Sequence, residues 1–249
     1  MYKYETHLHT YEASLCAGTH AEDYPAYYKS MGYSGIIVTD HFFNGNTRIP
    51  VYDDWNKRIN EFCLGYEHAK EAGDRIGFPV FFGFEFNFSG DEFLIYGLDK
   101  KWLLDHPDLL SYSRTKLYDT VHQDGGLMVQ AHPFRERGYL SEINLNPETC
   151  DAMEAYNAGN DLINNQQCEL YCKQKGIFMT AGSDMHNAGS IPPEAHYGMQ
   201  FETPLTDIHD YVRRILNREG TLIVPEEERR ITITEIKNKL PVILHHRES

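Results

Sequence analysis

The sequence predicts a single α/β domain built on a mainly parallel sheet. Short apolar runs alternate with amphipathic stretches along the chain, a pattern typical of repeated strand–helix–strand units. The length of 249 residues suits one α/β barrel, a fold that typically takes about 250 residues. Clusters of histidine and carboxylate residues follow nearly every expected strand. Because strand ends meet at one face of an α/β barrel, these observations together predict a polar site at that face.

The first half of the chain is expected to hold four strands and two helices. The strands are expected at residues 3–8, 35–39, 79–88 and 92–98, and the helices at residues 21–31 and 53–72. The apolar runs on either side of Ser89-Gly90-Asp91 predict a hairpin, because these three residue types favour a tight turn.

The second half is expected to continue this alternation. Strands are expected at residues 126–130, 152–156, 177–181, 197–201 and 221–224, and helices at residues 114–122, 162–175 and 207–218. Gly176 and Gly220 follow the last two helices, as is typical of helix ends. Residues 226–230 are interpreted as a solvated face or tail connection, and residues 231–234 as a last strand or an oligomer contact. No internal repeat or linker interrupts the pattern, so residues 1–249 are expected to form one domain.

The charge balance excludes several classes of partner. The chain has 23 Lys and Arg against 37 Asp and Glu, a formal net charge of −14. Such an acid excess argues against binding to duplex nucleic acid and against a polybasic membrane contact. The chain has no apolar run long enough for a membrane span and no apolar signal-peptide core, so a cytoplasmic location is expected. The five cysteines are widely spread and are interpreted as reduced thiols. The sequence leaves the oligomeric state open.

Histidines and carboxylates gather in six short motifs. They read HLHT at residues 7–10, TDH at 39–41, GFEFNF at 83–88, QAHPFR at 130–135, MEAYNA at 153–158 and GSDMH at 182–186. His7 and His9 are two residues apart in an expected strand, so both imidazoles point to one side and can reach one metal ion. Glu85 lies in a run of Phe residues, where an ionised carboxylate is costly to bury unless it is paired or bound to metal. Histidine and carboxylate ligands suit Zn, Mn or Fe.

In their order, these six motifs resemble the PHP (polymerase and histidinol phosphatase) family of metal-dependent phosphoesterases. The resemblance runs from Tyr4 to about His186. It implies a single PHP-type domain whose fold is a distorted (β/α)7 barrel, a relative of the TIM barrel. It also implies two or three divalent metal ions, Zn, Mn or Fe, at the mouth formed by the C-terminal ends of the strands.

The resemblance further implies which residues bind the metals. Glu85 would bridge two metal ions, the first held by His7, His9 and Asp184 and the second by His132. The third ion would be held by His41 and His186.

Two positions depart from the usual family pattern. Many relatives have a histidine soon after the first motif, and here Glu12 is the most plausible substitute, with His20 as the less favoured one. Many relatives also have a histidine after the bridging glutamate, whereas residues 92–97 contain none. That difference leaves the second metal either weakly held or completed by substrate and water.

The function implied is hydrolysis of a phosphate ester of a small molecule or nucleotide by a hydroxide that bridges two metals. Arg135 suits a bidentate contact to phosphate. Asn157 would hydrogen-bond the substrate or a metal-bound water, and Asp184 would accept a proton as well as bind metal. Whether the substrate is a monoester or a diester stays open. The alternatives are hydrolysis of an amide or lactone, and a non-catalytic metal-binding regulatory domain.

Overall fold

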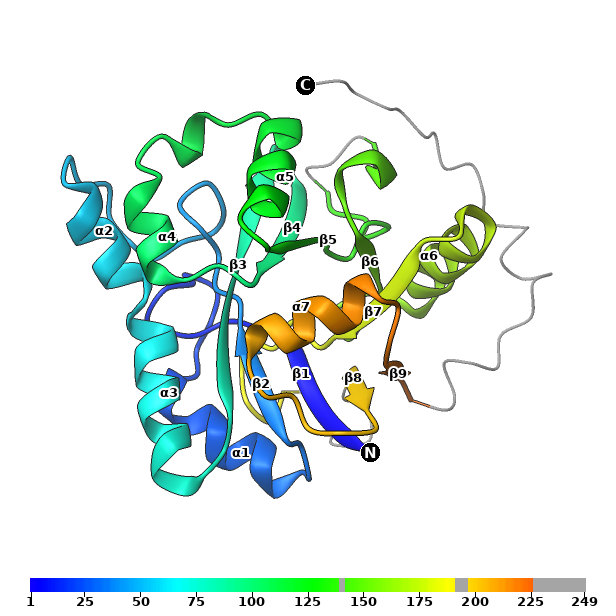
Figure 1. Ribbon diagram of the computed structural model, residues 1–249, viewed down its shortest axis with the longest axis horizontal. Helices are drawn as coiled ribbons and strands as arrows, with labels where there is room; N and C mark the ends of the chain where they lie inside the picture. Colours follow the sequence, from blue (N-terminus) through cyan, green and yellow to red (C-terminus); the bar gives the residue numbers. More distant parts are fainter. Residues whose placement is uncertain (139–141, 191–196, 226–249) are drawn as a thin grey trace.

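Nine strands form one continuous sheet in the computed structural model, which describes residues 1–138, 142–190 and 197–225. In spatial order they are β7 (Phe178–Gly182), β6 (Ala152–Asn157), β5 (Leu127–Gln130), β4 (Asp91–Tyr96), β3 (Val80–Phe88), β2 (Gly35–Val38), β1 (Tyr2–Leu8), β8 (Gly198–Phe201) and β9 (Thr221–Ile223). Helices surround this sheet (Figure 1). The elements considered for residues 226–234 lie outside the described residues.

Seven of these strands run in one direction, and two run against them. Strand β4 is antiparallel to both β3 and β5, and β8 is antiparallel to both β1 and β9. The common direction of seven strands agrees with the expected mainly parallel sheet, and the reversed β4 is the expected hairpin strand, whereas the reversal of β8 was not expected. The cause at β4 is the expected hairpin: Ser89 and Gly90 have positive φ angles of 55° and 107°. A two-residue turn of this kind returns the chain directly beside the strand it leaves.

Strand β7 returns to β1 and nearly closes the sheet into a barrel. The backbone N–H of His9 donates to Met185 O at 2.8 Å, and Leu8 pairs with Met185 in a parallel bridge. The hydroxyl of Thr6 donates to Ala181 O at 2.7 Å. These contacts lie at the C-terminal ends of β1 and β7, where the polar motifs were expected to meet. The barrel-like α/β fold is therefore confirmed.

The helices follow the expected pattern with two differences. They are α1 (Tyr24–Ser30), α2 (Trp55–Phe62), α3 (Leu64–Ile76), α4 (Lys100–Asp105), α5 (Arg114–Gln123), α6 (Leu162–Lys175) and α7 (Ile208–Leu216), with short 3-10 turns at Ala21–Asp23, Leu109–Ser111 and Pro147–Thr149. The one helix expected at residues 53–72 is two helices that break at Cys63, which lets α2 pack on α4 while α3 packs on β3. Helix α4 was not expected, and its start is capped by Asp99, whose side chain accepts from Trp102 N.

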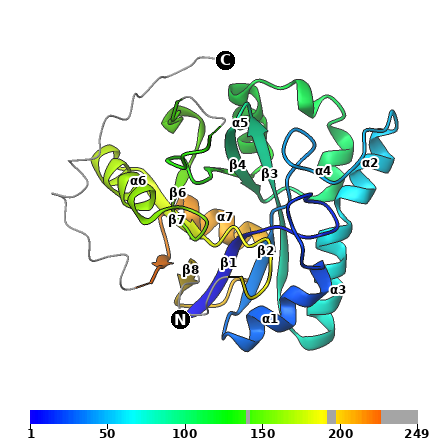
Figure 2. The same ribbon diagram turned by 180° about the vertical axis from the view of Figure 1, so that it is seen from behind.

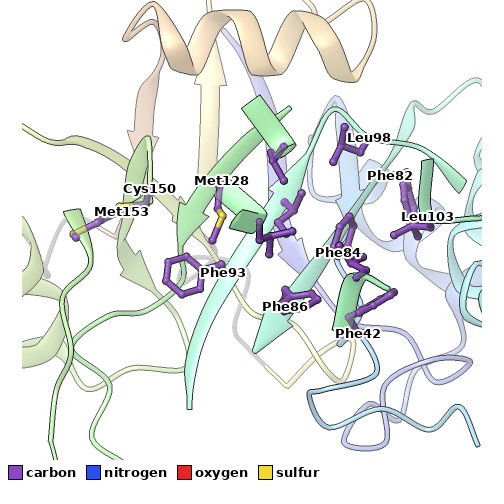
Figure 3. Close-up of a cluster of buried hydrophobic side chains, with 14 of the residues drawn as sticks. Phe42, Phe82, Phe84, Phe86, Phe93, Leu98, Leu103, Met128, Cys150 and Met153 are labelled. Atoms are coloured by element: carbon purple, nitrogen blue, oxygen red, sulfur yellow. The ribbon is translucent and has the colours of Figure 1, made fainter. Parts of the chain in front are cut away.

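The two faces of β3 pack against different neighbours because side chains alternate along a strand. Phe82, Phe84 and Phe86 belong to the largest buried apolar cluster, which includes residues of α2 and α4. Figure 3 shows these rings together with Phe42 and Leu103. Glu85 lies between two of these phenylalanines in sequence, so its side chain lies on the opposite, inner face of the sheet. The alternation of Phe with polar residues in this strand thus places one carboxylate inside the barrel.

Helix α7 covers the inner face of the sheet near the starts of the strands. Its Tyr211, Val212 and Ile215 belong to a buried cluster with Tyr4 of β1 and Leu127 of β5. In Figure 1 this helix crosses in front of the strands, and in Figure 2 it lies behind them. Apolar packing therefore fills the barrel beneath the polar strand ends. No helix within the described residues has the length and apolar character to cross a membrane.

The contact between Thr6 and Ala181 gives a test of barrel closure. Replacing Thr6 by Val keeps the shape of the side chain but removes the buried donor, so the free energy of unfolding should fall by about 1–3 kcal/mol. Urea denaturation measures this change. The matched control is Thr206→Val, at an exposed threonine, which should change the stability by less than about 0.5 kcal/mol. Equal effects of the two substitutions would contradict the role of Thr6.

Candidate metal centre

Seven of the predicted metal ligands converge at the barrel mouth. His7 and His9 lie at the end of β1, and Glu85 lies in β3. The others lie in the loops that follow β2 (His41), β5 (His132) and β7 (Asp184, His186). In the described residues, four overlapping groups have ligand atoms within 4.8 Å of one another: His9 with His41 and His186, His7 with Glu85 and His132, His7 with His9 and Asp184, and His41 with Glu85 and Glu92.

Glu85 lies at the centre of these groups. The side chain is 1% exposed, with Oε1 3.2 Å from His132 Nε2 and Oε2 2.6 Å from His41 Nδ1. Despite that short separation, neither Glu85 Oε2 nor His41 Nδ1 has a hydrogen-bond partner. Two buried polar atoms that lie close together without a shared hydrogen bond fit a pair of ligands to one cation. The residues present therefore fit a divalent metal ion.

The charges in the cluster stabilise one another strongly. Burial lowers the pKa of the His7 imidazole, but the negative charges of Glu154, Asp184 and Glu85 outweigh it and raise the pKa to about 10. Burial raises the pKa of Glu85, yet the positive charges of His41 and His7 hold it well below its usual value. Two of the carboxylates that the sequence predicts as ligands, Glu85 and Asp184, are thus ionised at neutral pH. A divalent cation finds deprotonated oxygen ligands here.

A buried carboxylate that the sequence analysis missed orients His7. Glu154 Oε1 lies 3.0 Å from His7 Nδ1, which leaves His7 Nε2 as the atom that can bind metal. Glu154 Oε2 also accepts hydrogen bonds from the His132 backbone N–H at 3.2 Å and from Asn157 Nδ2 at 2.8 Å. Metal-binding histidines commonly hold such a carboxylate on their second nitrogen. The sequence contains a signal for this residue, because Glu154, like Glu85, is a carboxylate within an expected strand.

Glu5 and Asp40 hold the backbone that carries the ligands. Glu5 is fully buried, and its Oε1 accepts from the backbone N–H groups of His7 at 2.9 Å and Ser183 at 3.0 Å. It therefore ties β1 to the loop that carries Asp184. Asp40 accepts from Thr10 N at 2.6 Å and from Ser14 Oγ at 2.7 Å, and Ser14 Oγ lies 3.2 Å from His9 Nδ1. Asp40 thus fixes His9 through Ser14 rather than by direct contact.

Two of the converging residues have an unusual backbone conformation. His132 has a φ of 29° and Asp184 a φ of 53°, in the left-handed region that side chains other than glycine rarely adopt. Such conformations cost free energy and persist where the surrounding structure enforces them, often at functional sites. At Asp184, the hydrogen bonds from neighbouring Ser183 to Glu5 supply that constraint.

The residues predicted to act in catalysis are closely linked to one another. Arg135 donates from Nη1 to Asp184 Oδ2 at 2.7 Å and from Nη2 to Asn157 Oδ1 at 2.6 Å. Asn157 is fully buried and also donates to Glu154 Oε2. Asn157 is therefore buried behind Arg135 and does not line the cavity beside it.

The structure does not bring Glu12 or His20 to the cluster. Glu12 Oε1 lies 3.2 Å from His20 Nδ1 and 3.6 Å from His68 Nδ1, and Glu12 Oε2 accepts from Ala21 N. Neither residue belongs to any of the four ligand groups found in the described part of the chain. Glu12 instead caps the turn that leads into α1.

Two other residues take places near the ligands. Glu92 Oε2 lies 3.5 Å from His132 Nε2, and Glu92 shares a ligand group with His41. It reaches the mouth because β4 is antiparallel and begins there. The side chain of Cys16 lines the same cavity as His186 and His41. Partial burial raises the pKa of this thiol, but these two imidazoles lower it to about 6.

The cluster opens into a cavity of about 380 Å³. Its lining includes the candidate ligands His41, His132, Asp184 and His186, together with the two guanidinium groups of Arg135 and Arg137, the amides Asn44, Asn46 and Asn87, and also Cys16, Glu92 and Gly45. A cavity of this size accommodates a small molecule.

Comparisons with known proteins establish the fold. No protein-family model matches the chain, and no curated protein matches it. A Bifidobacterium adolescentis protein assigned as a metal-dependent phosphoesterase has a TM-score of 0.54 and 16% identity, over 88% of this chain and 96% of that one. A two-domain Bacteroides vulgatus protein containing a predicted PHP-like metal-dependent phosphoesterase has a TM-score of 0.64 and 16% identity, over 90% of this chain and 65% of that one.

A third similar structure has a different activity in its name. It is an amidohydrolase from Chromobacterium violaceum, solved with bound sulfate and no metal, with a TM-score of 0.54 and 12% identity over 92% of this chain and 100% of that one. At these identities the likeness concerns the fold. The chain thus has the PHP-like barrel fold that its motifs indicated.

Metal binding should release protons from the cluster. In the absence of metal, His7 is protonated at neutral pH because neighbouring carboxylates raise its pKa to about 10. A metal ion bound at His7 Nε2 displaces that proton, so the apparent affinity should rise with pH, by up to about tenfold per pH unit for each proton released. Calorimetric titration with Zn²⁺ in buffers of different ionisation enthalpy measures the proton count. An affinity that does not change between about pH 6 and pH 8 would contradict this assignment.

Glu154 should support metal binding without contacting the metal. The substitution Glu154→Gln removes the charge that orients His7 Nδ1, and the Zn²⁺ affinity should fall by about 10- to 100-fold. Competition with a chromophoric chelator gives the affinity. The control Glu148→Gln changes an exposed glutamate and should leave the affinity unchanged. Unchanged affinity in the Glu154 variant would show that His7 needs no such partner.

Proposed function

We propose that this protein is a metal-dependent hydrolase of phosphate esters of small molecules. The observation that carries the proposal is the set of ionised oxygen and imidazole donors around Glu85, at the mouth of a cavity lined by two arginines. The donor set can bind metal cations, and the two arginines can bind an anion beside them. A phosphate ester is a substrate that would contact both the metal ions and the arginines.

Zn, Mn or Fe ions held by this cluster would lower the pKa of water and neutralise the oxygens of a phosphoryl group. We assign His7, His9, Glu85 and Asp184 to the first ion, and His132, Glu85 and Glu92 to the second, because their ligand atoms lie close together. Glu92 would add a carboxylate ligand to the second ion, whose coordination was expected from the sequence to be completed by substrate and water. The number of ions proposed is two or three.

Arg135 and Arg137 line the cavity beside these ligands. Arg135 donates through Nε, Nη1 and Nη2 to Asn160, Asp184 and Asn157, respectively. A guanidinium group has five N–H donors, so two remain for an oxygen anion. The internal bonds hold the guanidinium plane fixed, which reduces the entropy lost when an anion binds. The net charge of −14 therefore does not prevent binding of an acidic substrate, because the charges near the site set the electrostatic potential that the substrate meets.

Asp184 is assigned to metal binding rather than to proton transfer. Burial raises its pKa, but His7 and Arg135 outweigh this effect and hold the pKa well below its usual value. A carboxylate that ionises so readily is a weak proton acceptor near neutral pH. Its Oδ1 lies 3.0 Å from His9 Nε2 while its Oδ2 accepts from Arg135, so one oxygen is available to a metal.

The similar structures support more than one reaction. Two of them have phosphoesterase in their names, and one is an amidohydrolase. Hydrolysis of an amide or lactone is therefore the second candidate, because the same metals polarise a carbonyl group. Arg135 and Arg137 favour the phosphate ester, since a neutral amide gains little from two adjacent guanidinium groups.

A substrate screen distinguishes the two reactions. Purified protein is loaded with Mn²⁺, Zn²⁺ or Fe²⁺ and is offered nitrophenyl phosphate, bis-nitrophenyl phosphate, a lactone panel and an amide panel. We expect product from at least one phosphate ester, and a loss of about a hundredfold or more in His9→Ala, because His9 is placed to bind metal. His209→Ala, at an exposed histidine of α7, is the matched control. Turnover of amides or lactones without hydrolysis of any phosphate ester would select the second candidate. Full activity of His9→Ala would refute the metal mechanism.

A further inference from the structure

The guanidinium group of Arg135 is enclosed by the loop that follows β6. Its Nε donates to Asn160 Oδ1 at 2.6 Å, and its Nη2 donates to Asn157 Oδ1 at 2.6 Å. The third partner is Asp184, whose Oδ2 accepts from Nη1 at 2.7 Å. Two of these three partners are therefore neutral amides from one short loop. A neutral amide orients a guanidinium group without cancelling its charge, so that charge stays available to an anion.

One side chain of α6, Asn165, holds both of these amide residues. It lies in the first turn of the helix and is fully buried. Its Oδ1 accepts from the backbone N–H of Asn157 at 3.1 Å and from Asn160 Nδ2 at 3.0 Å. Its Nδ2 donates to Asn157 O at 3.1 Å. Asn165 thus uses both ends of its amide group to fix the two loop residues that contact Arg135.

The loop fits closely around the guanidinium group at Gly159. A Cβ at this position would lie 2.9 Å from Arg135 Nη2 and 3.1 Å from Asn157 Oδ1. The backbone N–H of Gly159 donates to the same Asn157 Oδ1 at 2.8 Å. Because three hydrogen bonds hold the guanidinium group, it cannot move aside at little cost. A side chain at this position would therefore displace Arg135 from its partners.

The same hydrogen bonds connect Arg135 to the candidate metal ligands. Asn157 Nδ2 donates to Glu154 Oε2 at 2.8 Å, and Glu154 Oε1 lies 3.0 Å from His7 Nδ1. On the other side of the guanidinium group, Asp184 both accepts from Arg135 and belongs to a ligand group. The guanidinium group is therefore held in a fixed position relative to the metal ligands.

We propose that Asn157, Gly159, Asn160 and Asn165 form a clamp that fixes Arg135 for binding of the phosphoryl group, with Asn165 as a positioning residue. This inference rests on the proposed function, because the anion at Arg135 is then the phosphoryl group of the substrate. The clamp orders the guanidinium group before the anion arrives, so less entropy is lost on binding. Of the four residues, only Asn157 lies in the motifs at residues 7–186 that indicated the site.

Hydrogen exchange tests the clamp without any ligand. The Nε–H signal of Arg135 is followed in the ¹⁵N-labelled full chain and is assigned by its absence in Arg135→Lys. We expect Asn165→Ala, which removes the three hydrogen bonds of its side chain, to speed this exchange by about tenfold or more. The matched control is Asn164→Ala, at the neighbouring buried asparagine of α6, which should leave the exchange rate unchanged. Equal rates in the wild type and Asn165→Ala would overturn the clamp.

Phosphate binding tests the role of the clamp in the site. Calorimetry measures the affinity of the Mn²⁺-loaded protein for inorganic phosphate. We expect about tenfold weaker binding in Asn165→Ala and in Gly159→Ala, the effect of about one hydrogen bond to an anion. The Mn²⁺ affinity should stay as in the wild type, because neither residue belongs to a ligand group in the described part of the chain. Gly159 is exposed, so its variant keeps the test valid if Asn165→Ala does not fold.

The controls and outcomes separate the clamp from the proposed function. Asn164→Ala and Gly138→Ala, the latter at an exposed glycine, should bind phosphate as the wild type does. Wild-type phosphate affinity in both clamp variants would overturn the clamp and leave the proposed function intact. An equal loss of phosphate and Mn²⁺ affinity would show a merely structural role and would also overturn the clamp. A wild type that binds Mn²⁺ but no phosphate would overturn the proposed function, and this inference with it.

Discussion

The whole site depends on one buried negative charge, the carboxylate of Glu85. An ionised carboxylate inside a barrel costs several kcal/mol unless cations surround it, and β3 places this one on the inner face of the sheet with 1% exposure. Imidazoles from β1, from the loop after β2 and from the loop after β5 surround it. Nearby carboxylates raise the pKa of His7 and of His41, so in the absence of metal the protons on these two histidines supply the compensating charge. A bound metal ion would take the place of such protons.

The candidate ligands are held by a second set of buried carboxylates that belong to none of the ligand groups in the described residues. Glu154 fixes the ring of His7, Glu5 ties the backbone of β1 to that of the loop after β7, and Asp40 fixes His9 through Ser14. Each of them accepts several hydrogen bonds, which offsets the cost of its burial. The left-handed conformations of His132 and Asp184 lie next to residues anchored in this way. Precision at the ligand atoms thus comes from neighbouring carboxylates rather than from the strands alone.

Much of this architecture could be predicted from the sequence, because it follows from local patterns. The spacing of His7 and His9 and the isolation of Glu85 among phenylalanines are local, and the structure brings these residues together. Glu154 is likewise a carboxylate within an expected strand, but it was not predicted as a site residue. Cys16 had none, because its place in the cavity lining with His41 and His186 arises from the path of a loop. Helix α4 is six residues long, too short to show a helical period, and the break at Cys63 depends on what each half packs against.

The reversed strand β4 makes the length of one turn a functional constraint. The register pairs Asn87 with Glu92 and Glu85 with Leu94, so Glu92 reaches the barrel mouth from the start of its strand. A residue inserted at Ser89-Gly90 that shifted this register by one would turn Glu92 to the phenylalanine side. Most loops at such a mouth can lengthen freely. This turn can lengthen only if the pairing of β3 with β4 is kept, so engineering of the rim has more freedom at the other loops.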